Sequence, residues 1–225
     1  MQVFFDNPWF ASLPAEDAQA LLDAGRILKL ARGACIFRQG EVPADSAGTF
    51  FGVASGVVRL SMLHAGGNET ILAIMEPGNW FGFTSQLNGL PRSHSTIAHT
   101  DVELLAVSAP AFQNLMQRLG FAQGMVRLLA GRLRLAYGMT ADQALSSTRE
   151  RVARRLAFLV NGDMALSTSR SNIIDTSQDT LAMMLGITRP TLNKELQWLA
   201  SRGAIALHYG RIEIKDLQLL LANFD

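Results

Sequence analysis

Short apolar runs separated by glycine-containing turns fill the first half of the chain. Between residues 31 and 107 the runs lie at 35–37, 49–53, 57–63, 70–75, 95–98 and 103–107, with Gly40, Gly56 and Gly78 among the turn residues between them. Several short strands at this spacing are typical of a small antiparallel barrel or jelly roll. Ahead of them, residues 1–30 contain one predicted helix, at about 14–24.

A helical periodicity begins at Pro110 and continues to about Met139, with a predicted break near Gly120. Apolar residues recur along two seams, so this helix is apolar on two sides and needs cover on both. One side can lie on the strands, and the same helix of a second copy is the simplest cover for the other. The alternative is a helix buried wholly within its own monomer. One seam runs through Leu115, Leu119 and the expected dimer contacts Ala122, Val126, Leu129, Leu133 and Ala136, and the other through Met125, Leu128, Leu135 and Met139.

Residues 176–202 have the pattern of two helices joined by a tight turn. Thr176 is the expected N-cap of the first helix, with Asp179 three residues later in a weaker form of the capping box. Gly186 ends that helix, because glycine adopts the left-handed conformation that a sharp exit needs. Thr188 then caps the second helix, and Pro190 lies in its first turn, where a missing N–H costs little.

Small and apolar residues are expected at the joint between these two helices. Ala182 permits a close crossing, Leu192 fills the joint, and Leu196 and Leu199 continue the inward face. This predicts a helix-turn-helix, whose second helix enters the DNA major groove; an ordinary helical hairpin is the alternative. The outer face of the second helix offers base- and phosphate-binding side chains and no acidic residue, with Glu195 toward the flank. The candidate DNA-binding residues are Gln178, Thr188, Arg189, Pro190, Thr191, Asn193, Lys194, Gln197 and Arg211.

The segments around the helix-turn-helix fit a complete winged domain. Residues 141–147 are the expected hinge, 149–161 a first helix, 162–170 a polar loop and 172–175 a strand. After the second helix, residues 205–214 predict a β-hairpin with its turn at Gly210. A hairpin in this place is a wing, where Arg211 and His208 are candidates for phosphate contacts.

Composition narrows the possible functions. A net charge of +1 argues against a general nucleic-acid coat, whereas a site-specific binder needs only a local basic patch, and the basic residues do cluster late in the chain. The single cysteine, Cys35, excludes an intramolecular disulfide, a four-cysteine zinc site and a cysteine-ligated iron–sulfur cluster. Its apolar surroundings favour a buried strand residue.

Other classes of function lack support in the sequence. The four histidines, His64, His94, His99 and His208, are too scattered for a metal or haem site. No nucleophile–base pair, phosphate loop or metal-ligand cluster is present, so we expect no enzyme activity. A signal-peptide pattern and a long uninterrupted apolar stretch are also missing, so we expect a cytoplasmic protein without a membrane partner.

Four short motifs and the helix-turn-helix together resemble the Crp–Fnr family of bacterial transcription regulators over nearly the whole chain. The motifs are Arg-Gln-Gly-Glu at 38–41, Ser-Gly-Val-Val at 55–58, Glu-Pro-Gly-Asn-Trp-Phe-Gly at 76–82 and Pro-Arg-Ser at 91–93. The resemblance implies an α+β fold with three parts. These are a cyclic-nucleotide-binding-like, jelly-roll-like antiparallel β-roll at 1–109, a dimerisation helix and hinge at 110–145, and a winged helix-turn-helix at 146–225. The implied partners are operator DNA (double-stranded), a second copy of the chain and, as a further candidate, RNA polymerase.

The recognition helix departs from the family at one position. The family pattern is Arg-Glu-Thr-x-x-Arg, and the matching residues here are Arg189, Pro190, Thr191 and Lys194. Arg189 can still bind guanine bidentately, and Lys194 can reach a guanine or a phosphate. Pro190 removes the acidic side chain that accepts from cytosine, so we expect an operator that differs from the usual family half-site.

The effector site departs from the family more strongly. Members that bind cyclic AMP carry Gly-Glu and, about ten residues later, Arg followed by Ser or Thr, for the ribose hydroxyl and the cyclic phosphate. Here Phe83 replaces the glutamate, so we expect cyclic AMP to bind weakly or not at all. Arg92 fits an anion site and a structural salt bridge equally, which leaves a small anionic effector open. The candidate effector residues are Gly82, Phe83, Arg92 and Ser93, with Ala136 and Tyr137 near the adenine position.

Two functions from different classes therefore agree with the sequence. The first is a homodimeric, sequence-specific transcription regulator with an altered cyclic-AMP pocket. The alternative is an effector-binding module whose C-terminal domain binds protein. The polar and basic face of the recognition helix favours the first. No cofactor is implied, and neither the effector, the operator nor the choice between activation and repression follows from the sequence.

Overall fold

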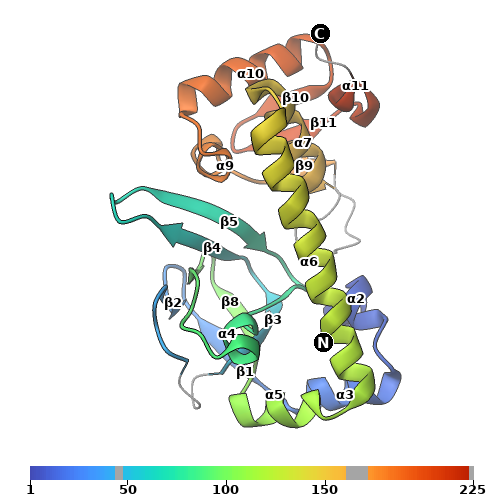
Figure 1. The fold of residues 1–225 in the computed structure, drawn as a ribbon. Helices are drawn as coiled ribbons and strands as arrows, with labels where there is room; N and C mark the ends of the chain where they lie inside the picture. Colours follow the sequence, from blue (N-terminus) through green and yellow to red (C-terminus); the bar gives the residue numbers. More distant parts are fainter. Residues whose placement is uncertain (44–47, 161–171, 223–225) are drawn as a thin grey trace. The chain divides into compact units, whose positions relative to one another are not determined.

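The computed structural model describes residues 1–43, 48–160 and 172–222. The chain forms two compact units, the first ending at Arg132 and the second beginning at Leu133, so that the change of unit falls within one long helix. Figure 1 shows that helix, α6 (Leu119–Leu145), and the elements of each unit. The part boundaries expected at residues 109 and 145 stay a prediction.

Two antiparallel four-stranded sheets form the first unit, which confirms the predicted α+β protein with a β-roll. Their orders are β1-β8-β3-β6 and β2-β7-β4-β5. Strands β1 and β6 were not expected from the sequence, and the other six lie within a residue or two of their predicted positions. The strands are β1 (Gly25–Leu30), β2 (Cys35–Phe37), β3 (Phe50–Ser55), β4 (Val58–Leu63), β5 (Glu69–Met75), β6 (Trp80–Phe81), β7 (Ser95–Ala98) and β8 (Val102–Val107).

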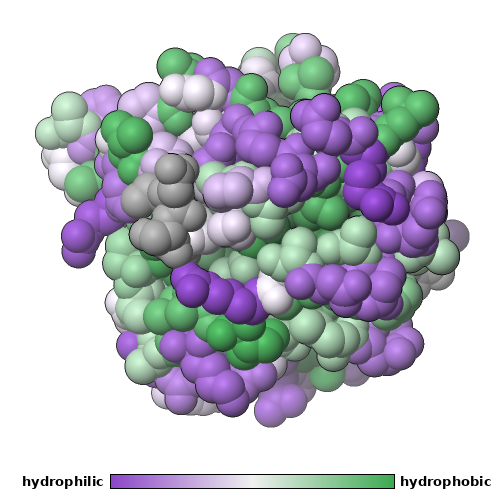
Figure 2. All heavy atoms as spheres, turned by 90° about the horizontal axis from the view of Figure 1, so that it is seen from below, coloured by the Kyte–Doolittle hydropathy of each residue, from purple (hydrophilic) through white to green (hydrophobic). Residues whose placement is uncertain are grey.

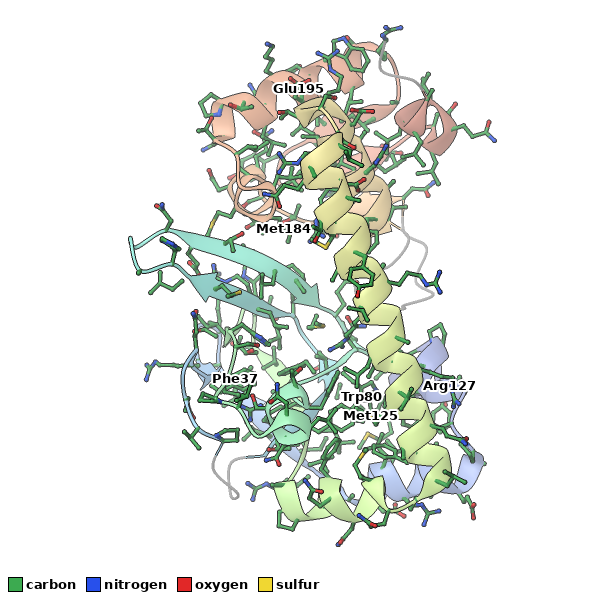
Figure 3. All side chains as sticks on the ribbon, in the orientation of Figure 1. Phe37, Trp80, Met125, Arg127, Met184 and Glu195 are labelled. Carbon is green, nitrogen blue, oxygen red and sulfur yellow. The ribbon has the colours of Figure 1, made fainter. Side chains whose placement is uncertain are left out.

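The core of this unit is aromatic and centred on Trp80. The ring of Phe10 stacks on Trp80 at a centroid distance of 5.8 Å, and the rings of Phe4 and Phe50 lie 4.7 and 4.9 Å away. Met125 of α6 belongs to the same buried cluster, and Figure 3 shows Met125 and Trp80 pointing into one region between the helix and the roll. Burial of each such side chain stabilises the fold by roughly 1.5–3 kcal/mol.

The N-terminal segment supplies part of that core through helices that the sequence pattern did not reveal. Besides α3 (Ala15–Asp23), which was expected, it forms α1 (Gln2–Phe5) and α2 (Pro8–Ala11). The indole N–H of Trp9 donates to the carbonyl of Gly124 at 2.7 Å and so ties α2 to α6. Helices of four residues are too short to show a 3.6-residue period, which explains why the single-helix prediction for residues 1–30 was wrong.

Helices α4 (Thr84–Asn88), α5 (Ala109–Met116) and α6 (Leu119–Leu145) complete the first unit and lead into the second. The expected break in the long helical region is present, at Gln117 and Arg118. The prediction of a hinge at residues 141–147 was largely wrong, because α6 continues without interruption to Leu145. In the first unit α6 buries Phe121, Met125 and Leu128.

The second unit has the elements of a winged helix-turn-helix. A three-stranded antiparallel sheet of order β10-β11-β9 accompanies its helices. The polar loop expected at 162–170 lies outside the described residues. The elements are α7 (Thr148–Val160), β9 (Ile173–Ile174), α9 (Gln178–Leu185), α10 (Arg189–Ser201), β10 (Ile205–His208), β11 (Arg211–Ile214) and α11 (Leu217–Leu221).

Two surface features complete the description. Cys35 lies in strand β2 as expected, but its side chain is exposed, so the prediction of a buried cysteine was wrong. In the view of Figure 2, polar residues separate the apolar ones into small patches. Among the described helices, none is long and apolar enough to cross a bilayer.

Candidate functional site

Local capping fixes the geometry of the helix-turn-helix. The Ser177 hydroxyl accepts from the Thr180 N–H at 3.0 Å, so Ser177 is the N-cap of α9 and the prediction of Thr176 was one residue too early. Gly186 ends α9 in the left-handed conformation with φ of 63°. Thr188 caps α10 by accepting from the Thr191 N–H at 3.3 Å, as predicted.

The inner face of α10 is anchored and its outer face is open. Leu192, Leu196 and Leu199 are buried, as is Ala182 of α9 at the joint. The candidate DNA-binding residues of α9, α10 and the wing all belong to the second unit. Thr191 and Gln178 are half-buried, whereas Thr188, Arg189, Pro190, Asn193, Lys194, Gln197 and Arg211 are exposed.

A carboxylate that the sequence analysis treated only as a cap lies beside the main base-reading candidate. The Nη1 atom of Arg189 is 3.4 Å from the Oδ2 atom of Asp179, and both side chains are largely exposed. Such a surface pair contributes only about 0–1 kcal/mol, so it orients Arg189 without immobilising it. The signal in the sequence was the position of Asp179 in the first turn of α9, close to the tight turn that leads into α10.

Of the two phosphate-binding candidates in the wing, Arg211 is exposed, whereas His208 contacts a carboxylate of the same hairpin. His208 and Arg211 are direct partners in the β10–β11 hairpin. His208 Nε2 lies 3.2 Å from an oxygen of Glu213, whose other oxygen accepts from Lys215 Nζ at 2.8 Å. The hydrogen bond from Lys215, followed by that from His208, lowers the pKa of Glu213. Arg211 is therefore the candidate left for phosphate.

A buried ion pair holds the recognition helix from behind. Glu195 is buried, and its Oε2 accepts from Arg149 Nε of α7 at 2.7 Å, so the expectation that Glu195 lies toward the flank was wrong (Figure 3 labels Glu195). The Arg149 guanidinium also lies over the Trp198 ring at 4.0 Å. From the same helix α7, Arg151 donates to the Leu185 carbonyl at 2.6 Å. This gives a hydrogen-bond partner to a carbonyl at the C-terminus of α9, which has none within the helix.

In the roll, the effector candidates Gly82 and Arg92 are joined directly. Gly82 has φ of 95°, and a Cβ there would lie 2.6 Å from the Thr49 carbonyl oxygen, so only glycine fits. Its carbonyl accepts a hydrogen bond from Arg92 Nη1. The Arg92 side chain is 5% exposed and its guanidinium lies 4.1 Å from the centroid of the Phe37 ring. Burial lowers the pKa of Arg92, and the charge of Glu41 opposes this.

The salt-bridge alternative for Arg92 finds no support in the described part of the chain, where none of the ion pairs includes this residue. Phe83 is buried and packs edge-on against Phe50 at a centroid distance of 5.7 Å. Ser93 is exposed, and its hydroxyl lies 3.0 Å from His94 Nδ1. Ala136 and Tyr137 are exposed on the part of α6 that belongs to the second unit.

Arg132 is a member of this region that the sequence analysis missed. Its guanidinium lies 4.9 Å from the centroid of the Phe83 ring, and its Nη2 donates to the Trp80 carbonyl. Burial lowers the pKa of Arg132 to about 10, which leaves it protonated at neutral pH. The signal was available, because residue 132 occupies the position between Leu128 and Leu135 in an otherwise apolar seam.

No metal centre can be built from the described residues, which contain no group of three potential His, Cys, Asp or Glu ligands.

A β-roll followed by a long helix and a winged helix-turn-helix defines a two-part DNA-binding regulator. Residues 27–119 match the model of the cyclic nucleotide-binding domain, and residues 150–222 match that of the Crp-like helix-turn-helix domain.

Comparison with individual proteins gives the family. The chain is 33% identical over 215 residues to the cyclic AMP receptor protein of Thermus thermophilus, covering 95% of each chain. It is 29% identical over 194 residues to a CRP-like cAMP-activated global transcriptional regulator of Mycobacterium tuberculosis, covering 84% of each. The chain therefore belongs to the Crp–Fnr family and is a DNA-binding transcription regulator with a cyclic-nucleotide-binding-type domain.

Solved structures agree with this assignment. The catabolite activator protein of Thermus thermophilus matches with a TM-score of 0.54 at 32% identity, over 96% of this chain and 100% of that one. FixK2 from Bradyrhizobium japonicum matches with a TM-score of 0.74 at 21% identity, over 87% and 95% of the two chains, and supports the fold alone.

Proposed function

We propose that the protein works as a homodimer that reads two operator half-sites through α10, and that its roll responds to an effector other than cyclic AMP. The observation that carries the proposal is the two-sided character of α10. Its three leucines and Glu195 are buried, while Arg189, Asn193, Lys194 and Gln197 are exposed. A helix built in this way is rigidly supported and can enter a major groove.

Arg189 and Lys194 are the proposed readers of base and phosphate. Arg189 is exposed at the first position of α10, where recognition helices place their base contacts. Its guanidinium can form the bidentate contact to guanine O6 and N7. Pro190 at the next position offers no acceptor for a cytosine amino group, so the operator is expected to differ from the usual family half-site. Arg211 of the wing adds a phosphate contact.

The dimer is proposed to form through the exposed apolar side of α6. Val126, Leu129 and Leu133 are 65%, 38% and 51% exposed, whereas Met125 and Leu128 on the other side are buried. Three large apolar residues in a row along one helix side are a self-complementary surface for a two-fold interface. Ala122 is half-buried and Ala136 exposed, and their small side chains permit close approach at the ends of this contact.

Weak cyclic-AMP binding is proposed because the ribose acceptor is missing. A ribose hydroxyl placed against Phe83 loses its water partner and gains none, at a cost of about 1–3 kcal/mol. The exposed residues Ala136 and Tyr137 stand where family members carry the Thr-Ser pair that contacts adenine. The combined loss approaches about a hundredfold in affinity.

Operator selection from random double-stranded DNA tests the regulatory function directly. We expect enriched fragments with two inverted half-sites about one helical turn apart, which is the geometry of a two-fold symmetric reader. Fluorescence anisotropy on the selected fragment then gives the affinity. The protein-interaction alternative gains support only if no sequence is enriched and the protein binds all duplexes equally weakly.

Calorimetry with cyclic AMP tests the altered site. We expect no binding at micromolar concentration by the parent protein and a gain in the Phe83→Glu variant, because the new carboxylate restores a ribose acceptor close to Arg132. Phe83→Gln is the matched control, which introduces polarity without charge. A low-micromolar dissociation constant for the parent protein would show that another residue supplies the acceptor.

A further inference from the structure

Three basic side chains converge in the interior of the β-roll. The Arg92 guanidinium and the His94 ring flank Phe37, at 4.1 and 5.6 Å from the centroid of its ring. Arg132 reaches the same place from α6, since its charge and that of Arg92 both act on His94. The site is thus built from β2, the segment before β7, and α6.

Thr96 adds a hydroxyl to this cluster. Thr96 is the direct partner of Phe37 across the β2–β7 ladder, and directly opposed residues in an antiparallel pair project to the same face. His94 lies just before β7, and its contact with the Phe37 ring places it at the same face. Thr96 is fully buried, so this face is the interior of the roll.

Each member of the cluster keeps one polar atom without a partner. Four buried atoms of the cluster have no hydrogen-bond partner: Arg92 Nε, Arg132 Nε, His94 Nε2 and Thr96 Oγ1. Buried polar groups are almost always paired, so four orphans in one cluster require an explanation. Arg92 and Thr96 are each more than nine-tenths buried, which excludes bulk solvent as the partner.

The cluster also lacks a counter-charge. Among the described residues, no carboxylate forms an ion pair with Arg92 or Arg132. Glu41 acts on Arg92 from a distance, and one of its oxygens accepts from the Arg38 N–H. The Phe83 ring, rather than a carboxylate, faces the Arg132 guanidinium. An uncompensated pair of buried cations is unfavourable.

We propose that Arg92, Arg132, His94 and Thr96 form the binding site of a small dianion, and that His94 takes up a proton when the site fills. The inference rests on the proposed function of the roll as a sensor and assigns the chemical class of its effector. Two guanidiniums match two negative charges, carried by one sulfate- or phosphate-like group or by two carboxylates. A cyclic nucleotide carries one negative charge and leaves one guanidinium uncompensated.

The proton follows from the surroundings of His94. Burial first, then the charges of Arg92 and Arg132, lower the pKa of His94 to about 4, so the free site holds a neutral imidazole at pH 7. Ser93 Oγ contacts its Nδ1 atom, and the Phe37 ring covers one side. A bound dianion offsets both guanidiniums and accepts from Nε2, which raises the pKa of His94. Dianion affinity therefore falls as pH rises from the pKa of the free site toward that of the bound state, and it levels off above the latter.

Titration calorimetry of the full chain with sulfate and with succinate tests the site, with butyrate as the matched monoanion. Sulfate stays a dianion between pH 6 and 8, so any pH dependence belongs to the protein. We expect at least one of the two dianions to bind about tenfold tighter than butyrate, and to bind about tenfold tighter at pH 6 than at pH 8. Which dianion binds distinguishes a compact oxyanion from a dicarboxylate. Butyrate binding as tightly as both dianions, or no dianion binding, overturns the proposal.

Two variants separate the roles within the cluster. His94→Gln should bind the dianion with a flat pH profile, and Arg132→Gln should lose at least tenfold in affinity. Arg134→Gln, which changes an exposed arginine two positions along α6, is the control and should leave both properties unchanged. Circular dichroism of each variant verifies folding. A parent-like pH profile in His94→Gln overturns the proton coupling.

Operator binding by the same preparations keeps this inference distinct from the proposed function. A protein that binds its operator but no dianion retains the regulatory function and overturns the dianion site. A protein that binds dianions but no DNA sequence retains the site and contradicts the DNA-reading proposal.

Discussion

At the residue scale, Glu195 shows how a charged side chain can be structural rather than functional. It lies within the recognition helix, yet it is buried and paired with Arg149, whose guanidinium in turn covers Trp198. Periodicity placed Glu195 toward the flank of the helix, whereas the structure buries it. Its partner is 46 residues away in the sequence, so no local pattern reveals the pair.

Removal of this carboxylate should destabilise the second unit. We expect Glu195→Ala to lower its free energy of unfolding by roughly 2–4 kcal/mol, because Arg149 is left half-buried without a counter-charge. Native-state hydrogen exchange of the α10 backbone amides measures the change in this unit. Glu213→Ala, which removes a half-buried carboxylate of the wing whose partners His208 and Lys215 are exposed, should have a much smaller effect. Equal effects of the two variants would argue against a supporting role of the buried pair.

Single residues that act through local geometry were predictable, and those that act through distant partners were not. Gly186 and Thr188 occupy their predicted positions because a helix end and an N-cap depend on a few neighbouring residues. The exposure of Cys35 and the position of Arg132 beside Phe83 depend on the packing of whole elements. The altered effector residue Phe83 was visible in the sequence, but its place in the aromatic core was not.

At the scale of single elements, α10 supports a prediction about sequence reading. Arg189→Ala should cost about 1–3 kcal/mol on the selected operator and weaken discrimination at one base pair, because a bidentate contact to guanine is lost. Asp179→Asn should leave discrimination intact and raise affinity slightly, because it removes a carboxylate that competes for Arg189. Anisotropy titrations on the operator and on single-base variants measure both. Unchanged operator binding by Arg189→Ala would show that α10 does not read the DNA as proposed.

Lys194 is expected to contact the DNA backbone, whereas Arg189 is expected to contact a base. If Lys194 binds phosphate, Lys194→Ala should weaken all duplexes to a similar extent and make the slope of log affinity against log salt shallower by about one unit. Titrations of operator and random duplex at several salt concentrations distinguish the two roles. A loss confined to the operator would instead assign Lys194 to a base.

The length of a helix or strand decided whether the sequence pattern could predict it. Strands β2, β3, β4, β5, β7 and β8 stand out because apolar runs alternate with glycine turns. Helices α1 and α2 and the two-residue strand β6 are shorter than any periodicity that defines them. The continuation of α6 to Leu145 was missed because its turns after Met139 mix polar residues with alanines and continue neither apolar seam.

At the scale of the whole molecule, α6 connects two units whose tasks differ. Its N-terminal half completes the core of the roll through Met125 and Leu128, and its C-terminal half belongs to the unit that carries the helix-turn-helix. The sequence predicted that this helix is apolar on two sides. One of those sides packs within the chain, and the other remains exposed, which makes the dimer the central prediction at this scale.

Charge placed on the exposed side of α6 should separate the dimer. Leu129→Glu and Leu133→Glu each put a carboxylate into a contact that the proposed dimer removes from water, so we expect monomers in solution. Operator affinity should fall steeply in both variants, because a monomer engages one half-site at a time. Light scattering gives the oligomeric state, and anisotropy gives the affinity for operator and for an isolated half-site.

The control is Leu90→Glu, which changes a leucine of similar exposure outside α6, 60% against 51% for Leu133. It should remain a dimer and bind the operator as the parent does, which separates the effect of position from that of added negative charge. Weakening of the full operator with no change on the half-site would assign the loss to dimerisation rather than to the reading surface. A parent protein that scatters as a monomer at micromolar concentration and still binds the full operator tightly would contradict the proposed dimer.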